Sequence, residues 1–216
     1  MPFTFSGESV DLRNVVIPTD RLRLEALTTK CSEDIFRNFT PDITRYMIPA
    51  PPKDIADTES FINDSLLGLR RGDDLTLVIS QPDGGHFLGL CGLHGRVRPN
   101  EPELGIWLRK AAHGHGYGRE AIAALKTWAE KYLEYERLTY PVDRRNIPSC
   151  KIPVALGGKV IAEQKKTSMS GIELDVIVYA FDAVLGWRYL DYNVGSGTTL
   201  KELTLNGPFV GAIFRW

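Results

Sequence analysis

The pattern of apolar and polar positions changes its period between residues 104 and 132. Residues 104–108 form a short apolar run with the length of a buried strand. After three closely spaced glycines, apolar residues recur at helical spacing, with Ile122, Leu125 and Ala129 on one face. These patterns predict a strand, a glycine-rich loop and a long helix, and the rest of the chain is read around this unit.

The remainder of the first 182 residues divides into shorter elements. Ser32 and, further on, Asp57 or Thr58 are candidate N-caps of two helices that precede the glycine loop, and Gly72 marks the end of the second. The segment from Pro41 to Pro52 is expected to be a loop. Strands are expected at residues 18–27, 75–79, 87–93, 137–142, 160–162 and 174–179.

The glycine loop has the properties of an anion site. The first N–H groups of a helix have no partners within the helix, and the helix dipole places partial positive charge at the same end. Gly114, Gly116 and Gly118 lack side chains that would hold an anion away, and Arg119 adds a full positive charge. The spacing fits neither a P-loop nor a dinucleotide fingerprint. Residues 113–119 are therefore predicted to bind a phosphate or diphosphate.

The same residues carry a resemblance to a known family. The stretch His113–Ala121, H-G-H-G-Y-G-R-E-A, resembles the acetyl-CoA loop of the GNAT superfamily. It is most similar to the ribosomal-protein N-terminal acetyltransferase branch, in which the loop typically reads W-G-K-G-Y-A-T-E-A. Residues 19–24 resemble the opening strand of that branch, T-x-R-L-x-L-R, and residues 146–157 resemble its N-x-x-S segment. His113 departs from the residues usual at the first position of the loop.

The resemblance implies a fold and a division of the chain. The fold would be α+β in three layers over residues 1–182, with a mixed, mostly antiparallel twisted sheet between flanking helices. A short helix is expected at residues 149–156, distorted by Pro153. Residues 183–216 would form an additional β-rich extension that packs on the domain or on a second subunit, since their many aromatic residues argue against a disordered tail.

The resemblance also implies acetyl-CoA as cosubstrate and no metal. In GNAT enzymes a β-bulge on the strand before the glycine loop separates that strand from its neighbour, and backbone groups there bind the pantetheine arm and the thioester carbonyl. The residues expected to contact acetyl-CoA are Trp107 and Leu108 through their backbones, His113, Gly114, His115, Gly116, Tyr117, Gly118 and Arg119 in the loop, and Asn146 and Ser149.

Acetyl transfer from a thioester to an amine needs a base for the amine and a hydrogen-bond donor for the leaving thiolate. Glu103 is the first candidate for the base, followed by Glu101 and then His94, although Glu103 could equally be an exposed charge at a strand end. Ser149 could hydrogen-bond the thiolate or cap a helix, because both roles use its hydroxyl. Many GNAT enzymes carry a tyrosine four residues after the serine, and here that position is Pro153.

The function indicated is an N-acetyltransferase that moves the acetyl group directly from acetyl-CoA to a primary amine, either a protein N-terminus or a small amine. An acyl-cysteine route through Cys150 is disfavoured, because the sequence places no His–carboxylate pair beside it. Two other classes stay open. One is a CoA-binding module that has lost catalysis, and the other is a protein that binds nucleotide or sugar phosphates with the same loop.

Composition indicates the kind of protein and the compartment in which we expect it. The 216 residues are 43% hydrophobic and carry a formal net charge of −1, which suits a globular chain and gives no sign of direct nucleic-acid binding. No apolar run approaches the ~18 residues of a membrane span, and residues 1–10 lack a basic region followed by an apolar core, so we expect no secretory signal. Three cysteines suit a reducing compartment. We therefore expect a cytoplasmic protein without membrane association, for which a homodimer is one possible assembly.

Overall fold

The computed structural model describes residues 2–83 and 85–183. An eight-stranded sheet in the order β2-β3-β4-β5-β6-β8-β10-β9 forms its centre, and a separate small sheet pairs β1 with β7. In the large sheet every neighbouring pair is antiparallel except β6 and β8. The strands are β1 Thr4–Phe5, β2 Val16–Pro18, β3 Arg23–Ala26, β4 Asp74–Ser80, β5 Phe87–His94, β6 Glu103–Leu108, β7 Leu133–Glu134, β8 Arg137–Asp143, β9 Lys159–Thr167 and β10 Glu173–Asp182.

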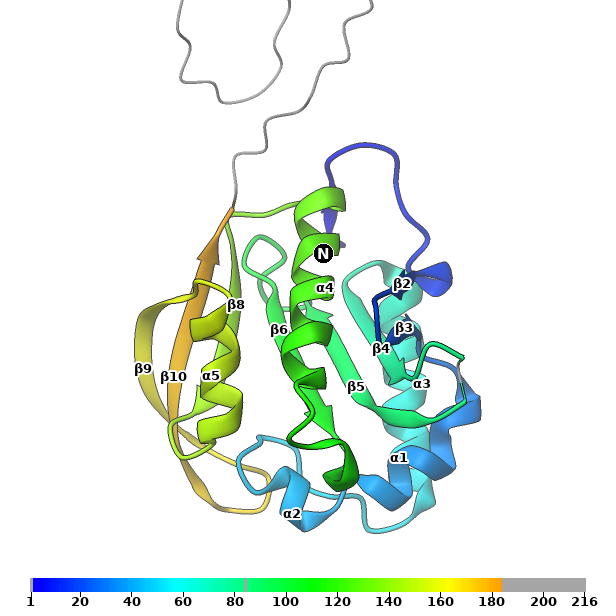
Figure 1. The fold of residues 1–216 in the computed structure, drawn as a ribbon, viewed down its shortest axis with the longest axis vertical. Coiled ribbons are helices and arrows are strands. Elements are labelled where there is room, and N and C mark those ends of the chain that lie inside the picture. The colour runs from blue at the N-terminus through cyan, green and yellow to red at the C-terminus, as the bar shows by residue number, and fades with distance from the viewer. Residues whose placement is uncertain (1, 84, 184–216) are drawn as a thin grey trace, which may run out of the picture. The chain divides into compact units, whose positions relative to one another are not determined.

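Helices cover both faces of this sheet, which gives three layers (Figure 1). Helices α4 and α5 lie on one face, and α1 and α3 lie on the other. The helices are α1 Ser32–Asn38, α2 Pro41–Thr44, α3 Ile55–Arg71, α4 Tyr117–Tyr132 and α5 Ile147–Ala155, and short 3-10 turns occur at Leu12–Asn14, Thr29–Cys31 and Lys110–Ala112. The predicted α+β class with a mostly antiparallel sheet is confirmed. The extension expected at the C-terminus lies, from residue 184 onward, outside the described residues.

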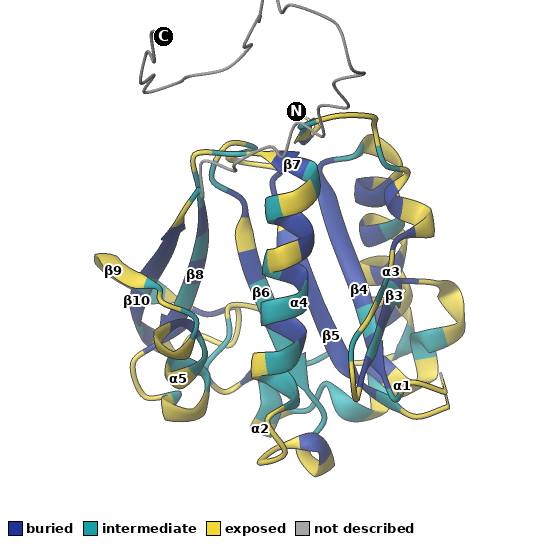
Figure 2. Ribbon diagram, turned by 45° about the horizontal axis from the view of Figure 1, so that its top comes forward, coloured by how far each residue is buried: buried dark blue, intermediate teal, exposed yellow. Residues whose placement is uncertain are grey.

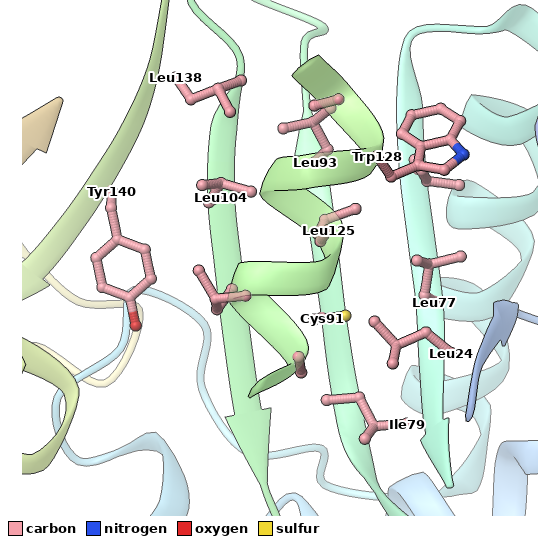
Figure 3. Close-up of a cluster of buried hydrophobic side chains, with 14 of the residues drawn as sticks. Leu24, Leu77, Ile79, Cys91, Leu93, Leu104, Leu125, Trp128, Leu138 and Tyr140 are labelled. Atoms are coloured by element: carbon pink, nitrogen blue, oxygen red, sulfur yellow. The ribbon is translucent and has the colours of Figure 1, made fainter. Parts of the chain in front are cut away.

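Each face of the sheet carries its own apolar core. The larger core lies under α4, where Leu104 and its neighbours on β4 and β5 meet Leu125 and Trp128 (Figure 3). The smaller core lies under α1 and α3 and includes Ile35, Ile62 and Leu90. The central strands β4 and β5 are buried along most of their length, whereas β9 is exposed at nearly every residue (Figure 2). The two cores therefore fix β6 and the start of α4 firmly against the central strands.

One expected strand and two expected loops differ from the sequence-based prediction. The strand at residues 18–27 is broken by a turn, in which the Thr19 N–H donates to the Leu22 carbonyl at 2.8 Å and the Leu22 N–H donates to the Thr19 hydroxyl at 2.9 Å. Residues 163–167, expected to be a polar loop, continue β9 because an edge strand can be polar and still pair with β10. The segment from Pro41 to Pro52 contains the short helix α2.

Both helix starts before the glycine loop were placed wrongly, while one helix end was right. Asp54, not Asp57 or Thr58, caps α3, because its carboxylate accepts the Asp57 N–H at 3.1 Å. Ser32 lies inside α1 and not at its N-cap. Gly72 ends α3 in the left-handed conformation, as predicted, with a φ of 74°. Which side chain caps a helix depends on the geometry of the preceding loop. The sequence alone cannot show that geometry, because several nearby Asp, Ser and Thr residues are all suitable N-caps.

Candidate active site

Strands β6 and β8 are neighbours in the sheet but pair at one position only, Glu103 with Thr139. Beyond this pair the strands diverge toward the start of α4 (Figure 1). The β5–β6 ladder is regular over residues 103–108, so the bulge expected on this strand is wrong. The separation lies between β6 and β8 themselves, because the β5–β6 and β8–β10 ladders each stay paired along these strands. We call this separation of the two backbones the β6–β8 splay.

The direction of the β6 backbone decides which of its polar groups face the splay. The Arg109 N–H donates to the Leu88 carbonyl at 2.8 Å, so the Leu108–Gly89 pair of this antiparallel ladder is not hydrogen-bonded. Trp107 must then direct its N–H and carbonyl toward β5, whereas Ile106 and Leu108 direct theirs toward the splay. Leu108 thus occupies the expected position, but Ile106 takes the place that was assigned to Trp107.

The Trp107 side chain lies on the opposite face, in a small aromatic cluster. Its ring centroid is 4.9 Å from that of Phe39 and 5.7 Å from that of Phe87. These rings pack beside the core under α1 and α3. Trp107 therefore packs on the α1 face of the sheet and directs no backbone donor toward the splay.

The glycine loop leaves its donors free. Gly114 and Gly116 have φ values of 81° and 79°, in the left-handed region that favours glycine, and Gly116 is the residue before the first turn of α4. In the part of the chain that the structure describes, the N–H groups of residues 114–119 donate no hydrogen bond. A side-chain carbon added at Gly114 would meet no atom within 4 Å, and one at Gly116 would meet only the Arg21 guanidinium, at 3.6 Å. The geometry is that of an open anion site.

Gly118 is needed for packing. A side-chain carbon there would lie 3.2 Å from Ile152 on α5 and 3.7 Å from Leu108 on β6. The absence of a side chain lets the first turn of α4 approach both elements. Gly118 thereby brings α5 against the loop, on the face of the sheet where the larger core lies.

The loop is held by a network that the sequence reading missed. The Glu120 carboxylate accepts hydrogen bonds from the Thr19 hydroxyl at 2.6 Å and from the Arg21 Nε at 2.8 Å, and Arg21 Nη1 donates to the His115 carbonyl at 3.0 Å. Partial burial would raise the pKa of Glu120, but the bonds from Thr19 and Arg21 outweigh it and lower the pKa overall. These residues are those of the T-x-R-L and E-A motifs, so the two motifs could have been paired from the sequence.

The other loop residues have separate placements. The His113 Nε2 lies 2.8 Å from the Leu108 carbonyl, so this ring already bonds one of the β6 groups that face the splay. His115 packs near Tyr117, with ring centroids 5.5 Å apart. Arg119 is exposed and makes no hydrogen bond or ion pair with the described residues. Arg119 is therefore the cation at the loop that is free to meet an anion.

On the other side of the splay, α5 begins at Ile147 and Asn146 is its N-cap, accepting the Ser149 N–H at 3.4 Å. The alternative in which Ser149 caps this helix is therefore wrong. Pro153 lies inside the helix, as expected, near its last turn. The cap leaves the Ser149 hydroxyl available, and it lies 2.8 Å from the hydroxyl of Tyr140 on β8.

The three candidates for the base differ in how strongly they are engaged. The Glu101 carboxylate lies 3.2 Å from both Arg98 and Arg137, so its charge is paired. His94 Nδ1 lies 2.5 Å from an Asp74 carboxylate oxygen. Partial burial would lower the pKa of His94, but the bond to Asp74 and the nearby carboxylates raise it overall. Glu103 is exposed, and it makes no hydrogen bond or ion pair with the described residues.

Glu103 and Ser149 come from opposite sides of the sheet. Leu104 is buried in the core under α4, so Glu103 beside it points to the other face, because side chains alternate along a strand. Ser149 lies on α5, on the α4 face. The splay is therefore bordered by a carboxylate on one face and a hydroxyl on the other.

The segment around α2 crosses the open end of the splay. Lys110, just after β6, lies 2.6 Å from the Asp42 carboxylate. The Arg145 guanidinium, just after β8, lies 5.6 Å from the centre of the Tyr46 ring. A backbone N–H in the turn between β9 and β10 donates to the Ile48 carbonyl at 2.8 Å. This segment therefore contacts both strands that border the splay.

Cys150 has no features of a nucleophile. Burial raises the pKa of its thiol, which stays protonated, and its sulfur lies 3.6 Å from the Asp143 carbonyl. Within residues 2–83 and 85–183, no three His, Cys, Asp or Glu side chains gather closely enough to hold a metal ion. None of the described helices has the length and apolarity that crossing a bilayer requires.

Comparison with known proteins shows which family of proteins the chain resembles. The profile of the acetyltransferase (GNAT) domain matches residues 21–159. An uncharacterized N-acetyltransferase, p20, of Bacillus licheniformis is 26% identical over 140 residues, which are 62% of this chain and 76% of the relative. A RimL ribosomal alpha-N-protein acetyltransferase in complex with coenzyme A superposes with a TM-score of 0.68 at 16% identity, covering 78% of this chain and 98% of that one.

A second solved structure has a similar fold. This acetyltransferase from Salmonella typhimurium, described as modifying the N-terminal serine of a 50S ribosomal subunit protein, has a TM-score of 0.68 at 16% identity and covers 78% of this chain and 99% of that one. The chain belongs to the GNAT acetyltransferase family, because the family profile covers more than half of it. It is an acyltransferase.

Proposed function

We propose that this GNAT acetyltransferase uses acetyl-CoA and transfers the acetyl group directly to a primary amine, on a protein N-terminus or a small molecule. The catalytic domain would be residues 1–182. The observation that carries the proposal is the row of unpaired N–H groups at residues 114–119, placed at the end of the β6–β8 splay. An anion site alone would fit many ligands, but here it continues into a strand whose free backbone groups can pair with an amide-containing arm.

Different residues would bind different parts of acetyl-CoA. The loop N–H groups and the exposed Arg119 would hold the diphosphate through charge-assisted hydrogen bonds. Ile106 and Leu108 would pair with the amides of the pantetheine arm, as a further strand would, because their N–H groups face the splay. Asn146 would act mainly by capping α5 and so placing Ser149. Bound acetyl-CoA supplies an activated acetyl group as a thioester.

Glu103 would accept the proton of the amine, and Ser149 would donate a hydrogen bond toward the leaving sulfur. Glu103 is the preferred base because its carboxylate makes no hydrogen bond or salt bridge with the described residues and has His94 as an electrostatic neighbour, whereas Glu101 is neutralised by two arginines. The placement of Glu103 and Ser149 on opposite faces suits direct transfer, in which the amine enters from the side opposite the departing thiol. The acceptor would then approach past Trp107 and the α2 segment.

A protein N-terminus is one acceptor class because the fold is similar to that of enzymes described as modifying ribosomal protein N-termini. A small amine or polyamine is the other. A panel of N-terminal peptides and small amines separates the two, with release of the CoA thiol from acetyl-CoA as the readout. Turnover with peptides alone would identify the first class, and turnover with amines alone would identify the second.

Glu103→Gln tests the role of the base. We expect kcat to fall by about 100-fold, because general-base catalysis typically contributes that much or more. Coenzyme A binding, measured by calorimetry, should stay unchanged. Glu101→Gln is the matched control, two residues away on the chain and held by arginines, and it should keep most of the wild-type kcat. Equal losses in the two variants would contradict the assignment of the base to Glu103.

The second candidate function is a CoA-binding module without catalysis. The observation that favours it is Pro153, which occupies the position where many GNAT enzymes carry a tyrosine. This candidate predicts coenzyme A binding without thiol release from any amine of the panel, and no effect of Glu103→Gln. A nucleotide-phosphate binder would instead bind ATP more tightly than coenzyme A.

A further inference from the structure

Tyr140 and Ser149 form a hydroxyl pair at the closed end of the splay. Tyr140 follows Thr139, the residue through which β8 pairs with β6, and its side chain is 2% exposed. Figure 3 shows the ring on β8, across from Leu104 on β6. Its hydroxyl lies 2.8 Å from the Ser149 hydroxyl. The pair thus joins β8 to the first turn of α5 beside the place where the thioester would lie.

A count of donors shows that this pair has one O–H left over. The two hydroxyls carry two O–H donors. The hydrogen bond between the hydroxyls uses only one of these donors. In the described part of the chain neither hydroxyl makes another hydrogen bond. Ser149 is only half-buried, so an O–H that stays unused within the pair can reach a ligand.

The chemistry of the two groups indicates which of them keeps the free O–H. Burial raises the pKa of Tyr140 to about 12, so the phenol stays protonated at any pH suited to an assay. A phenol is a better hydrogen-bond donor than an aliphatic alcohol, and the alcohol oxygen is the better acceptor. Tyr140 therefore donates to Ser149, and the Ser149 O–H can turn toward the splay.

We propose that Tyr140 is a positioning residue that aims the Ser149 hydroxyl at the sulfur of the thioester. The inference rests on the proposed function and adds to it a residue from β8. When the amine nitrogen bonds the carbonyl carbon and the C–S bond breaks, the electron pair of that bond goes to sulfur. Ser149 then hydrogen-bonds the sulfur as its charge grows, and neither hydroxyl gives up its proton. The proton that nitrogen loses to Glu103 returns through solvent to the thiolate.

This arrangement accounts for the missing tyrosine of α5. A tyrosine four residues after Ser149 would extend from the helix itself, whereas Tyr140 extends from the neighbouring strand. Pro153 at the helix position leaves the Ser149 hydroxyl without a partner from its own helix. Tyr140 supplies that partner from β8 and holds it rigidly, because the ring is packed in the larger core.

Tyr140→Phe is the direct test, because it removes the hydroxyl and keeps the ring. We expect kcat to fall about fivefold, since one neutral hydrogen bond is lost, with the KM for acetyl-CoA unchanged. Combining Tyr140→Phe with Ser149→Ala should lower kcat no further than Ser149→Ala alone. Tyr179→Phe is the matched control, because Tyr179 pairs with Tyr140 across β8 and β10, is 8% exposed, and makes no hydrogen bond through its hydroxyl to described residues.

A binding experiment gives an answer that does not depend on turnover. Wild type should bind coenzyme A several-fold more tightly than desulfo-CoA, in which hydrogen replaces the thiol. Tyr140→Phe and Ser149→Ala should lose this preference, while Tyr179→Phe keeps it. A Tyr140→Phe variant with wild-type kcat and wild-type preference would overturn the inference and leave the proposed function standing. If wild type binds neither ligand, the proposed function itself fails and the inference with it.

Discussion

Gly116 and Gly118 stand two positions apart and lack a side chain for different reasons. At Gly116 the backbone is left-handed and the space beside it is open, so a side chain would strain the loop and project into the space where the proposed diphosphate would lie. At Gly118 a side chain would press on Ile152 of α5. Substitution at the first position should affect ligand binding, and substitution at the second should affect packing.

Gly116→Leu is expected to weaken coenzyme A binding by about 10- to 100-fold, because one or two charge-assisted N–H bonds to the diphosphate are lost. Gly72→Leu is the matched control, with a φ of 74° against 79° and a nearest atom at 3.5 Å against 3.6 Å. Calorimetry gives the affinity and thermal unfolding gives the stability. We expect the two variants to lose similar amounts of stability, but only Gly116→Leu to lose affinity for coenzyme A. Unchanged affinity in Gly116→Leu would refute the anion site.

At the scale of elements, the turn between β2 and β3 supports the glycine loop. Arg21 reaches from this turn to the His115 carbonyl and to Glu120, which lies in the first turn of α4. Its guanidinium also lies 5.1 Å from the centre of the Tyr117 ring. The loop conformation that frees the N–H groups is therefore fixed by an element almost 100 residues earlier in the chain.

Arg21→Ala should weaken coenzyme A binding by about fivefold, because the loop loses a hydrogen bond at His115 and Glu120 loses its ionic partner. Arg23→Ala is the control, since Arg23 pairs with Glu25 on the same strand, away from the loop. Titration calorimetry on both variants makes the comparison. An affinity for Arg21→Ala equal to that of Arg23→Ala would show that the turn does not support the loop.

The sequence predicted elements well where one local pattern determined them. The apolar run of β6, the glycines and the helical period of α4 are all adjacent in the chain, and each was placed correctly. The splay could not be predicted from residues 103–108, because it depends on where β8, from a distant part of the chain, lies relative to β6. The Tyr140–Ser149 pair was missed for a related reason, since its two hydroxyls belong to separate elements that only the fold brings together.

At the scale of the whole molecule, two carboxylates couple the fold to pH. Hydrogen bonds from Thr19 and Arg21 lower the pKa of Glu120 against the effect of burial, and bonds from Arg145 lower that of Asp143 in the same way. A carboxyl with a lowered pKa in the folded state stabilises the fold above its unfolded pKa. That stabilisation is lost as the pH falls through the folded pKa.

The free energy of unfolding should therefore be higher at pH 6 than at lower pH and decline below about pH 4. Urea unfolding across that range measures it. Asp143→Asn and Glu120→Gln should each flatten the decline and lower the stability at pH 6, whereas Asn at the exposed Asp20 should change neither. An acid decline of the same steepness in all three variants would contradict the coupling.

The single rung between β6 and β8 has a mechanical consequence. Glu103 and Thr139 form the only ladder pair between these strands in the described chain, so the strands from β2 to β6 and the group of β8, β10 and β9 are held together mainly by the larger core that packs against both. A small change in the angle between the two groups would leave the ladders within each group intact, but it would repack the core between them. An arm bound along β6, as proposed, would lie between the two groups, so its binding and release would depend on contacts with both of them.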